Sequence, residues 1–365
     1  MDSSATEIEF DADGVCSFCR QFAARAERIL QIDPSIRRAK LERLSEEIRS
    51  RGHGRPYDCV VGVSGGVDSS WVLVNAVRMG LRPLAVHMDN GWNSELAQNN
   101  IANLVRGLGV DLYTHVIDWP EYRGLMQAFF DADVIDVELL YDNSMLAVNF
   151  QQALKVGTRS ILSGSNNATE GLRMPKEWSW CKLDKRNIRA LGARQGIRLR
   201  TFPAIGTASY VWNTVIRRLH WVWFLDYIDY NKAEAVAELQ SRFAYKPYPY
   251  KHYESVFTRF YQGYILPEKF GIDKRRVHFS TLIVSNQMTR EEAIEGLKGI
   301  PYPSEEALEA DKVYFVKKMG WTRAQLDDYI RRAPKSHADF PSEVGLFEAC
   351  TRLRKALTGS TSRQG

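Results

Sequence analysis

A glycine-rich loop stands directly after an apolar run, in "VGVSGGVDSSWVL". Gly65 and Gly66 let the backbone turn sharply with no side chain in the way, so that successive amides can converge on an anion. A helix that begins there adds its free N–H groups and its positive dipole end. Asp68 would repel a phosphate unless a Mg²⁺ ion lies between the two charges. The loop therefore predicts a phosphate site with magnesium, whereas the alternative is a plain glycine turn.

Two further polar stretches follow apolar runs that resemble strands. "HMDNGW" carries Met88 and Asp89, and "LSGSNNATEG" carries Gly164, Ser165 and Asn166. In parallel sheets the carboxyl ends of the strands meet at one edge, where ligands bind. We expect these residues to join the glycine loop there, although each stretch also fits an ordinary turn that ends a strand.

Strands alternate with helices from about residue 57 to residue 207. The expected strands are "DCVVGVS", "RPLAVHMD", "DLYTHVID", "SILSGS" and "RLRTFPAI", with helical patterns between the first three. Such alternation predicts right-handed βαβ units and an α/β fold with a doubly wound parallel sheet. The first strand is an unbroken apolar run, which is typical of a buried parallel strand.

The chain divides into three expected regions. Residues 1–55 hold a Cys-containing segment and a charged helix, residues 56–208 the nucleotide-binding α/β domain, and residues 209–365 a helical region for substrate or partner. The apolar stretch from Tyr210 to Ile228 contains four charged or ionisable side chains, which argues against a membrane span and favours a buried, aromatic-rich helix.

Bulk composition excludes several classes of protein. The 365 residues carry a net charge of +5 and 44% hydrophobic residues, which suits a globular protein without the concentrated basic stripe of a nucleic-acid binder. No secretory signal is visible, and five cysteines in so long a chain do not form a disulfide framework. We expect a cytoplasmic protein and leave a homo-oligomer open.

"SGGVDSS" resembles the pyrophosphate loop of the ATP-pyrophosphatase (PP-loop) superfamily. The resemblance implies an adenine nucleotide alpha-hydrolase-like fold and ATP with Mg²⁺ as cofactors. It also implies binding residues, namely Ser64, Gly65, Gly66, Val67, Asp68, Ser69 and Ser70 for the phosphates, Met88 and Asp89 for adenine and ribose, and Gly164, Ser165 and Asn166 for the α-phosphate.

The segment from Lys251 to Ala293, together with "EFDADGVCSFC" and "GLRMPKEWSW", is similar to N-acetyl sugar amidotransferases of the WbpG/PseA type. The resemblance implies an ATP-dependent, AMP-forming C–N ligase. The enzyme would convert an acetamido group of a bacterial sugar or nucleotide-sugar to an acetamidino group, for surface polysaccharide, O-antigen or flagellin glycans.

Roles for individual residues follow from that resemblance. Beside Asp68, the expected catalytic residues are Lys251 against phosphate charge, His252 and Glu254 for orienting the acetamide or accepting a proton, and Arg259 for a phosphate or carboxylate. Lys269, Arg275 and Arg276 are expected to hold a nucleotide-sugar phosphate. A solvated charge is the alternative for every basic residue in this group.

A glutaminase needs a nucleophilic cysteine, either directly after Met1 or in a G-x-C-x-G-like elbow. In this sequence residue 2 is Asp, and no such elbow occurs. We therefore expect free ammonia or a separate glutaminase/cyclase-like partner pair.

Cys16 and Cys19 form a C-x-x-C pair that is half a zinc ribbon. We expect either zinc or a reduced pair there. A tRNA-thiolating enzyme, which would use a cysteine pair to carry persulfide, is the second hypothesis after the amidotransferase. A non-catalytic ATP-binding module is the third.

Overall fold

The computed structural model describes residues 1–249 and 251–358, and it contains one parallel sheet. The strands are β1 (Cys59–Gly62), β2 (Pro83–Asp89), β3 (Leu112–Val116), β4 (Ser160–Ser163) and β5 (His220–Trp223). They lie in the order β3-β2-β1-β4-β5, and every neighbouring pair is parallel. The predicted α/β fold with a doubly wound parallel sheet is confirmed.

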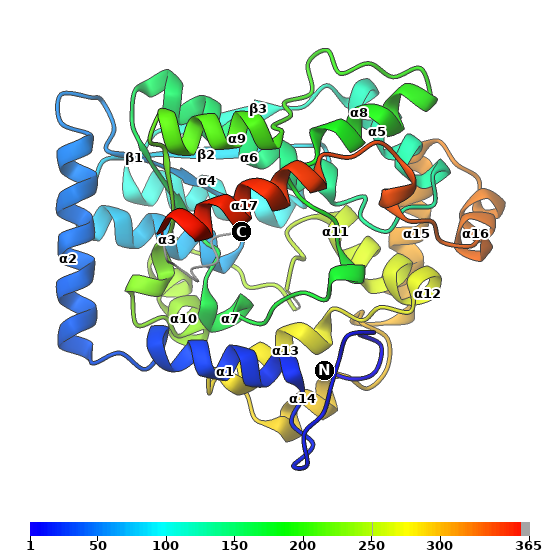
Figure 1. Cartoon of the computed structure of the whole chain (residues 1–365), viewed down its shortest axis with the longest axis horizontal. Coiled ribbons are helices and arrows are strands. Elements are labelled where there is room, and N and C mark those ends of the chain that lie inside the picture. The colour runs from blue at the N-terminus through cyan, green and yellow to red at the C-terminus, as the bar shows by residue number, and fades with distance from the viewer. Residues whose placement is uncertain (250, 359–365) are drawn as a thin grey trace.

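Helices surround the sheet (Figure 1). In the first half of the chain they are α1 (Ser17–Ile29), α2 (Pro34–Arg51), α3 (Val67–Arg78), α4 (Glu95–Leu108), α5 (Trp119–Asp131), α6 (Leu139–Val156), α7 (Asn167–Glu170) and α8 (Lys185–Arg194). Those in the second half are α9 (Thr207–Val211), α10 (Lys232–Phe243), α11 (Val256–Phe260), α12 (Leu266–Phe270), α13 (Arg275–Val284), α14 (Arg290–Gly296), α15 (Glu305–Met319), α16 (Arg323–Arg331) and α17 (Val344–Thr358). Short 3₁₀ or π turns are η1 (Lys176–Trp178), η2 (Trp212–Ile216), η3 (Phe224–Tyr227), η4 (Tyr261–Ile265) and η5 (His337–Asp339).

Helices α3 and α6 cover opposite faces of the sheet. Consecutive residues of β1 point to opposite faces of the sheet. Val60 packs with the side chains of α6, whereas Val61 packs with those of α3. This division follows from the two-residue period of a strand. Helix α3 starts where β1 ends, and α6 runs back along the sheet to β4, so both helices begin at the carboxyl edge of the strands.

The order of the strands reverses beside β1. The chain proceeds from β1 to β2 and β3 on one side, then places β4 and β5 on the other side of β1. Open sheets of this kind bind ligands in the crevice beyond such a switch point. The glycine loop follows β1 and therefore lies at this position.

The prediction of a fifth strand after α8 is wrong. "RLRTFPAI" is irregular, because the backbone N–H groups of Arg200 and Thr201 donate to the Glu121 carboxylate at 2.6 and 2.9 Å, and Pro203 has no N–H to give a sheet. The true edge strand is β5, from the region that we expected to be helical. The division into three regions remains a prediction, but its third part contributes to the sheet.

The single buried helix expected over residues 210–228 is also wrong. The segment passes through α9, η2, β5 and η3, and the left-handed backbone of Arg218 (φ 55°) ends its helical part. The free edge of β4 then offers hydrogen bonds that favour a strand. Trp212, Val215 and Ile216 are more than half exposed, so part of this stretch is not buried. Among the described residues, no helix combines the length and apolar character that a bilayer crossing requires.

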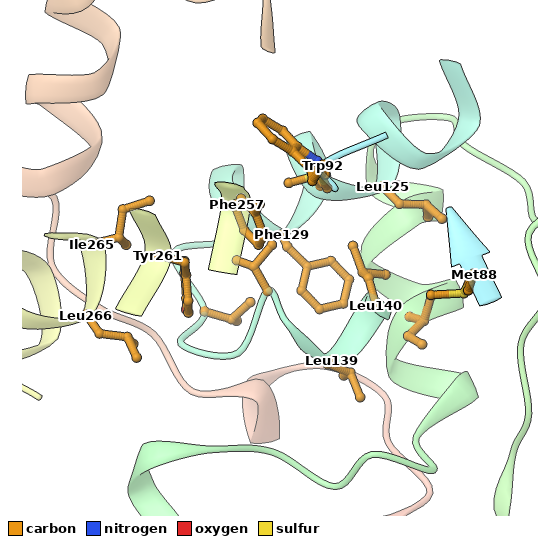
Figure 2. Packing of buried hydrophobic residues seen from close by; sticks show 14 of the residues in the cluster. Met88, Trp92, Leu125, Phe129, Leu139, Leu140, Phe257, Tyr261, Ile265 and Leu266 are labelled. Carbon is orange, nitrogen blue, oxygen red and sulfur yellow. The ribbon is translucent and has the colours of Figure 1, made fainter. Parts of the chain in front are cut away.

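Main-chain hydrogen bonds attach the C-terminal region to the sheet edge. The Ser94 N–H donates to Glu254 O at 2.9 Å, and the Val256 N–H donates to Trp92 O at 2.8 Å. Close by, Phe257 packs against Trp92 with ring centroids 5.4 Å apart. Figure 2 shows these rings in one core with Phe129, Leu140 and Met88, so the segment that begins α11 is fixed above the end of β2.

Lys269 does not bind a phosphate, which corrects the sequence-based expectation. Its side chain is fully buried, and its Nζ donates to Asp133 Oδ1 at 3.1 Å, to Tyr329 O at 2.7 Å and to Arg332 O at 2.6 Å. The ammonium thus joins α12 to the end of α16 and to the turn after α5. The helical spacing of the sequence gave no sign that this lysine points inward.

Replacing this lysine should destabilise the protein. Lys269→Met leaves a buried carboxylate with one partner fewer and two carbonyls unpaired, so we expect a loss of about 3 kcal/mol of unfolding free energy in urea titrations. Lys298→Met is the matched control, because that ammonium is 68% exposed and pairs only with a surface glutamate. Equal stability of the two variants would contradict the structural role of Lys269.

Candidate functional site

A cavity of about 470 Å³ lies at the carboxyl edge of the sheet. Ser64, Gly66, Val67, Asp68 and Ser69 line it from the loop between β1 and α3. Met88, Gly164, Ser165, Lys251, His252 and Glu254 line it from the other segments that the sequence had singled out. Residues distant in the chain therefore meet at one cavity.

The loop has the backbone geometry of a close-approach site. Gly65 has φ 85°, and a Cβ there would lie 2.8 Å from Ala97 O. Gly164 follows β4, and a Cβ there would lie 2.9 Å from the Ser69 amide nitrogen. No other residue fits either position without a backbone shift, so β4 and α4 can press against the loop and leave the start of α3 to an anion.

The loop hydroxyls are ordered by the loop itself. Ser64 Oγ accepts from the Gly66 N–H at 3.2 Å, while Ser69 Oγ and Ser70 Oγ donate to Gly66 O at 3.2 and 2.8 Å. Ser69 faces the cavity, whereas Ser70 is buried behind the loop. Ser70 therefore supports the turn rather than contacting the cavity.

Three more of the expected binding residues do not line the cavity. Gly65 forms the back of the turn. The Asp89 carboxylate accepts from the Gly91 N–H at 2.8 Å and from Asn93 Nδ2 at 3.1 Å, which shapes the turn after β2. Asn166 is fully buried and caps α7, since its Oδ1 accepts from the Thr169 N–H at 2.8 Å. Sequence spacing placed these residues at the correct edge of the sheet. It could not show which of them line the cavity and which only support the neighbouring turns.

Arg259 lies outside the cavity lining, and we no longer assign it a catalytic role. Its guanidinium pairs with both oxygens of Asp311, at 2.6 and 2.5 Å, and Asp311 also accepts from the Tyr302 hydroxyl at 2.9 Å. The pair joins α11 to α15. Arg275 and Arg276 are likewise occupied, by Asp273 at 2.7 Å and Asp2 at 2.9 Å.

Asp68 stands in a charged cluster that the sequence did not reveal. Burial raises the pKa of its carboxyl, Lys251 opposes that rise, and Glu170 adds to it. The Tyr230 hydroxyl donates to Asp68 Oδ1. Tyr230 lies outside every motif, and Glu170 lies in "LSGSNNATEG" but was not among the expected site residues of that stretch, so only the folded chain shows that both reach the loop.

Lys251 and Glu170 form a close ion pair in this cluster, with Nζ and Oε1 2.7 Å apart. Burial lowers the pKa of Lys251, but Glu170 and Asp68 outweigh it, so the pKa lies above its usual value. Burial raises the pKa of Glu170, while Lys251 and His252 lower it to a net value below the ordinary one. Lys232, also on the cavity, has a lowered pKa, chiefly because of burial.

His252 and Glu254 lie together, with Nδ1 and Oε1 3.7 Å apart. His252 adopts φ 65°, a left-handed conformation that turns the chain just before α11. Burial raises the pKa of Glu254, but hydrogen bonding and charge from His252 bring it below the usual value. Glu254 is thus a carboxylate at neutral pH, placed where it can accept a proton.

The donor set of this cluster fits magnesium bound with a nucleotide. Asp68 and Glu170 supply carboxylate oxygens, and Mg²⁺ commonly takes one or two carboxylates with substrate phosphates and water. The described residues contain no group of three or more His, Cys, Asp or Glu side chains that would hold a metal without such a ligand. Phosphate oxygens would have to complete the coordination.

The structure does not support zinc at Cys16 and Cys19. The Cys19 N–H donates to Cys16 Sγ at 3.3 Å, so the pair caps the start of α1, and no metal-binding cluster occurs around it in the described part of the chain. Burial raises the pKa of the Cys19 thiol to about 12, with Cys16 adding to the rise. These are the properties of a packed thiol.

The fold and the cavity define an α/β protein of the doubly wound class with a glycine loop at its switch point. Residues 254–354 match the family described as "LPS biosynthesis protein WbpG-like, C-terminal domain". The match bears out the resemblance seen in residues 251–293, and this part of the chain is similar to that domain.

Comparison of structures finds distant likenesses. The NMN synthetase from Francisella tularensis is 14% identical with a TM-score of 0.31, and the likeness covers 58% of this chain and 94% of that one. The NH3-dependent NAD synthetase from Campylobacter jejuni subsp. jejuni NCTC 11168, in complex with the nitrate ion, has the same identity and coverage with a TM-score of 0.30. No curated protein matches the chain by sequence.

The Lys251–Glu170 pair should make stability depend on pH in a defined window. Because the pKa of Glu170 is lowered and that of Lys251 is raised in the folded state, the pair stabilises the fold at neutral pH. That stabilisation is lost as pH falls through the folded pKa of Glu170 or rises through that of Lys251. Lys251→Met should therefore lower the Tm at pH 7, and its difference from wild type should shrink as the pH falls below about 4.5, the ordinary pKa of a glutamate carboxyl.

Thermal unfolding monitored by circular dichroism over this pH range is the measurement. Lys246→Met is the control, because that side chain is exposed on the same loop. A Tm difference for Lys251→Met that stays constant from neutral to acid pH would rule out the ion pair as its cause.

Proposed function

We propose that the chain is an ATP-dependent amidotransferase that converts the acetamido group of a bacterial sugar or nucleotide-sugar to an acetamidino group. The observation that carries the proposal is the glycine loop at the switch point, opening on a cavity whose far side is formed by a WbpG-like domain. The loop supports ATP, and the domain, named for lipopolysaccharide biosynthesis, supports a sugar.

The cavity suits activation of an amide. An amide carbonyl is a poor electrophile, so its oxygen must first become a better leaving group. In the proposed reaction the acetamide oxygen attacks the α-phosphorus of ATP and pyrophosphate departs. Ammonia then adds to the carbon, one proton is lost, and AMP leaves with the former amide oxygen.

Individual residues have defined tasks in this scheme. The start of α3 and the loop amides hold the phosphates. Lys251 and Lys232 offset the negative charge that grows as pyrophosphate leaves, in a cavity where burial strengthens such interactions. Glu254, with His252 beside it, accepts the proton that ammonia releases. Asp68 and Glu170 would hold magnesium, which would supply positive charge against the phosphates.

Two properties speak for the amidating reaction over tRNA thiolation. The Cys16–Cys19 pair does not line the cavity, and the raised pKa of Cys19 removes the thiolate that a persulfide carrier needs. A binding module without catalysis is disfavoured by the buried charges gathered around Asp68, because such clusters are costly unless they hold a ligand or perform chemistry.

Ammonia in this proposal comes from solution or from a separate glutaminase. Burial raises the pKa of Cys19 to about 12 and that of Cys181 to about 11, and it also raises that of Cys59. These three thiols lack the lowered pKa of a glutaminase nucleophile.

Asp68→Ala should reduce AMP formation by about 100-fold or more while the fold remains intact, because the proposed magnesium loses a ligand beside the phosphates. AMP release is measured with ATP, magnesium, ammonium chloride and diacetamido sugars, and folding is checked by circular dichroism. Asp328→Ala, at a carboxylate that is 60% exposed, is the control and should retain the wild-type rate. Wild-type AMP release by Asp68→Ala would contradict the role.

The nitrogen source should be ammonia. We expect the purified chain to turn over diacetamido sugars with ammonium chloride and not with glutamine alone, and mass spectrometry should find the product lighter by the difference between O and NH. Turnover driven by glutamine would refute the separate-glutaminase proposal. AMP release stimulated by RNA but not by any sugar would replace the proposed function with tRNA modification.

A further inference from the structure

The cavity has a second polar end that the roles above leave unused. It is formed by Glu138, Tyr141, Asp142, Lys182, Gln262 and Lys274, here called the α6 wall. Glu138, Tyr141 and Asp142 stand at the start of α6, whereas the other three come from the η1–α8 connection and the C-terminal region. Because α3 and α6 cover opposite faces of the sheet, the glycine loop and the α6 wall bound the cavity from two sides.

Glu138 is held rigidly towards the cavity. Gln262 Nε2 donates to its two oxygens at 3.0 and 3.1 Å, and Lys274 Nζ donates to Oε2 at 2.8 Å. The carboxylate is 9% exposed, and it is one of the groups that line the cavity. A carboxylate has about four acceptor positions, so Glu138 retains capacity for a ligand hydroxyl.

Lys182 and Asp142 form a more open part of the wall. Lys182 Nζ lies 2.7 Å from Asp136 Oδ2 and 2.9 Å from Asp142 Oδ2. Asp136 is buried and fixes the ammonium, while Asp142 and Lys182 remain about one third exposed. Burial raises the pKa of Asp142, with Lys182 opposing and Glu138 adding to the rise. The exposed part of this pair presents an acceptor and a donor side by side.

The charge balance of the wall disfavours a polyanion. Three carboxylates (Asp136, Glu138 and Asp142) face two ammonium groups (Lys182 and Lys274). The loop end also carries three carboxylates (Asp68, Glu170 and Glu254) and two ammonium groups (Lys232 and Lys251), but it adds the start of α3 and the carboxylates that would hold magnesium. A triphosphate therefore prefers the loop end, whereas alternating acceptors and donors suit hydroxyl groups, which both donate and accept.

We infer that the α6 wall is the subsite for the sugar ring, in which Glu138 and Asp142 accept from ring hydroxyls and Lys182 donates to a ring oxygen substituent. This inference rests on the proposed function for the identity of the ligand. The acetamido group would then point across the cavity towards the glycine loop and Glu254. Tyr141, adjacent to Asp142 in α6, lines the same cavity and carries a hydroxyl that can donate or accept.

The test separates binding from turnover. Saturation-transfer NMR with free diacetamidoglucose as the probe reports sugar binding by wild type, Asp142→Asn, Tyr141→Phe and Asp68→Ala. We expect the signal from the ring protons to be lost or weakened roughly tenfold in Asp142→Asn, since a hydrogen bond to a charged group is removed. It should be weakened in Tyr141→Phe and retained in Asp68→Ala. Tyr141→Phe removes one oxygen and keeps the packing, so it serves if Asp142→Asn fails to fold.

Steady-state kinetics provide the second readout. With diacetamido sugars as substrates, the wall variants should raise the KM for sugar roughly tenfold or more and leave the KM for ATP unchanged. Glu295→Gln is the matched control, because that carboxylate is 72% exposed on α14. A change in kcat with an unaltered KM for sugar would show that the α6 wall supports the structure and does not bind the sugar.

The outcomes of the two experiments are distinguishable. Loss of probe binding in the wall variants, with no turnover by wild type, would leave the subsite standing and refute the amidotransferase function. Turnover by wild type, with wall variants that bind and react like wild type, would refute the subsite alone. Absence of any probe signal from wild type would overturn the subsite.

Discussion

Two main-chain hydrogen bonds between the loop after β2 and the start of α11 hold the candidate site together. Through Glu254 O and the Val256 N–H, they place the segment from Lys251 to Glu254 over the glycine loop. The buried contact between Trp92 and Phe257 keeps water from competing for these bonds (Figure 2). Without this attachment, the β1 loop would face solvent and the cavity would lack its far side.

The charges at the site depend on that attachment. Lys251 and Glu170 are brought within 2.7 Å although they lie in different parts of the chain, and each shifts the pKa of the other. Asp68 stands in the same environment, so its ionisation is coupled to both. A cluster of this kind is unfavourable in a buried place unless opposite charges compensate it, and a bound nucleotide with magnesium would complete the compensation.

The two ends of the cavity would keep the two proposed substrates apart. Helix starts from opposite faces of the sheet meet at one edge, so the anion-binding loop of α3 and the mixed polar wall of α6 share a cavity without sharing residues. The start of α3 and a bound magnesium would suit phosphates at the loop end, and the mixed donors and acceptors of the α6 wall would suit hydroxyl groups. In the proposed reaction, the acetamido group would lie between the two ends.

Local rules of the chain determined the parallel sheet, the glycine loop and the similarity of residues 254–354 to the WbpG-like family, because each depends on periodicity or on a contiguous motif. The same rules failed for β5 and for residues 210–228, where an apolar aromatic pattern fits a helix and a strand equally and only the free edge of β4 decides.

Tertiary structure alone decided which charges face the cavity. Lys269 and Arg259 lie in the expected segment but point into buried pairs with Asp133 and Asp311. Lys232, Glu138 and Asp142 lie outside every motif, and Glu170 was not singled out within its stretch, yet all four line the cavity. The direction of a helical side chain relative to distant elements is set by packing, and a single sequence contains no record of those distances.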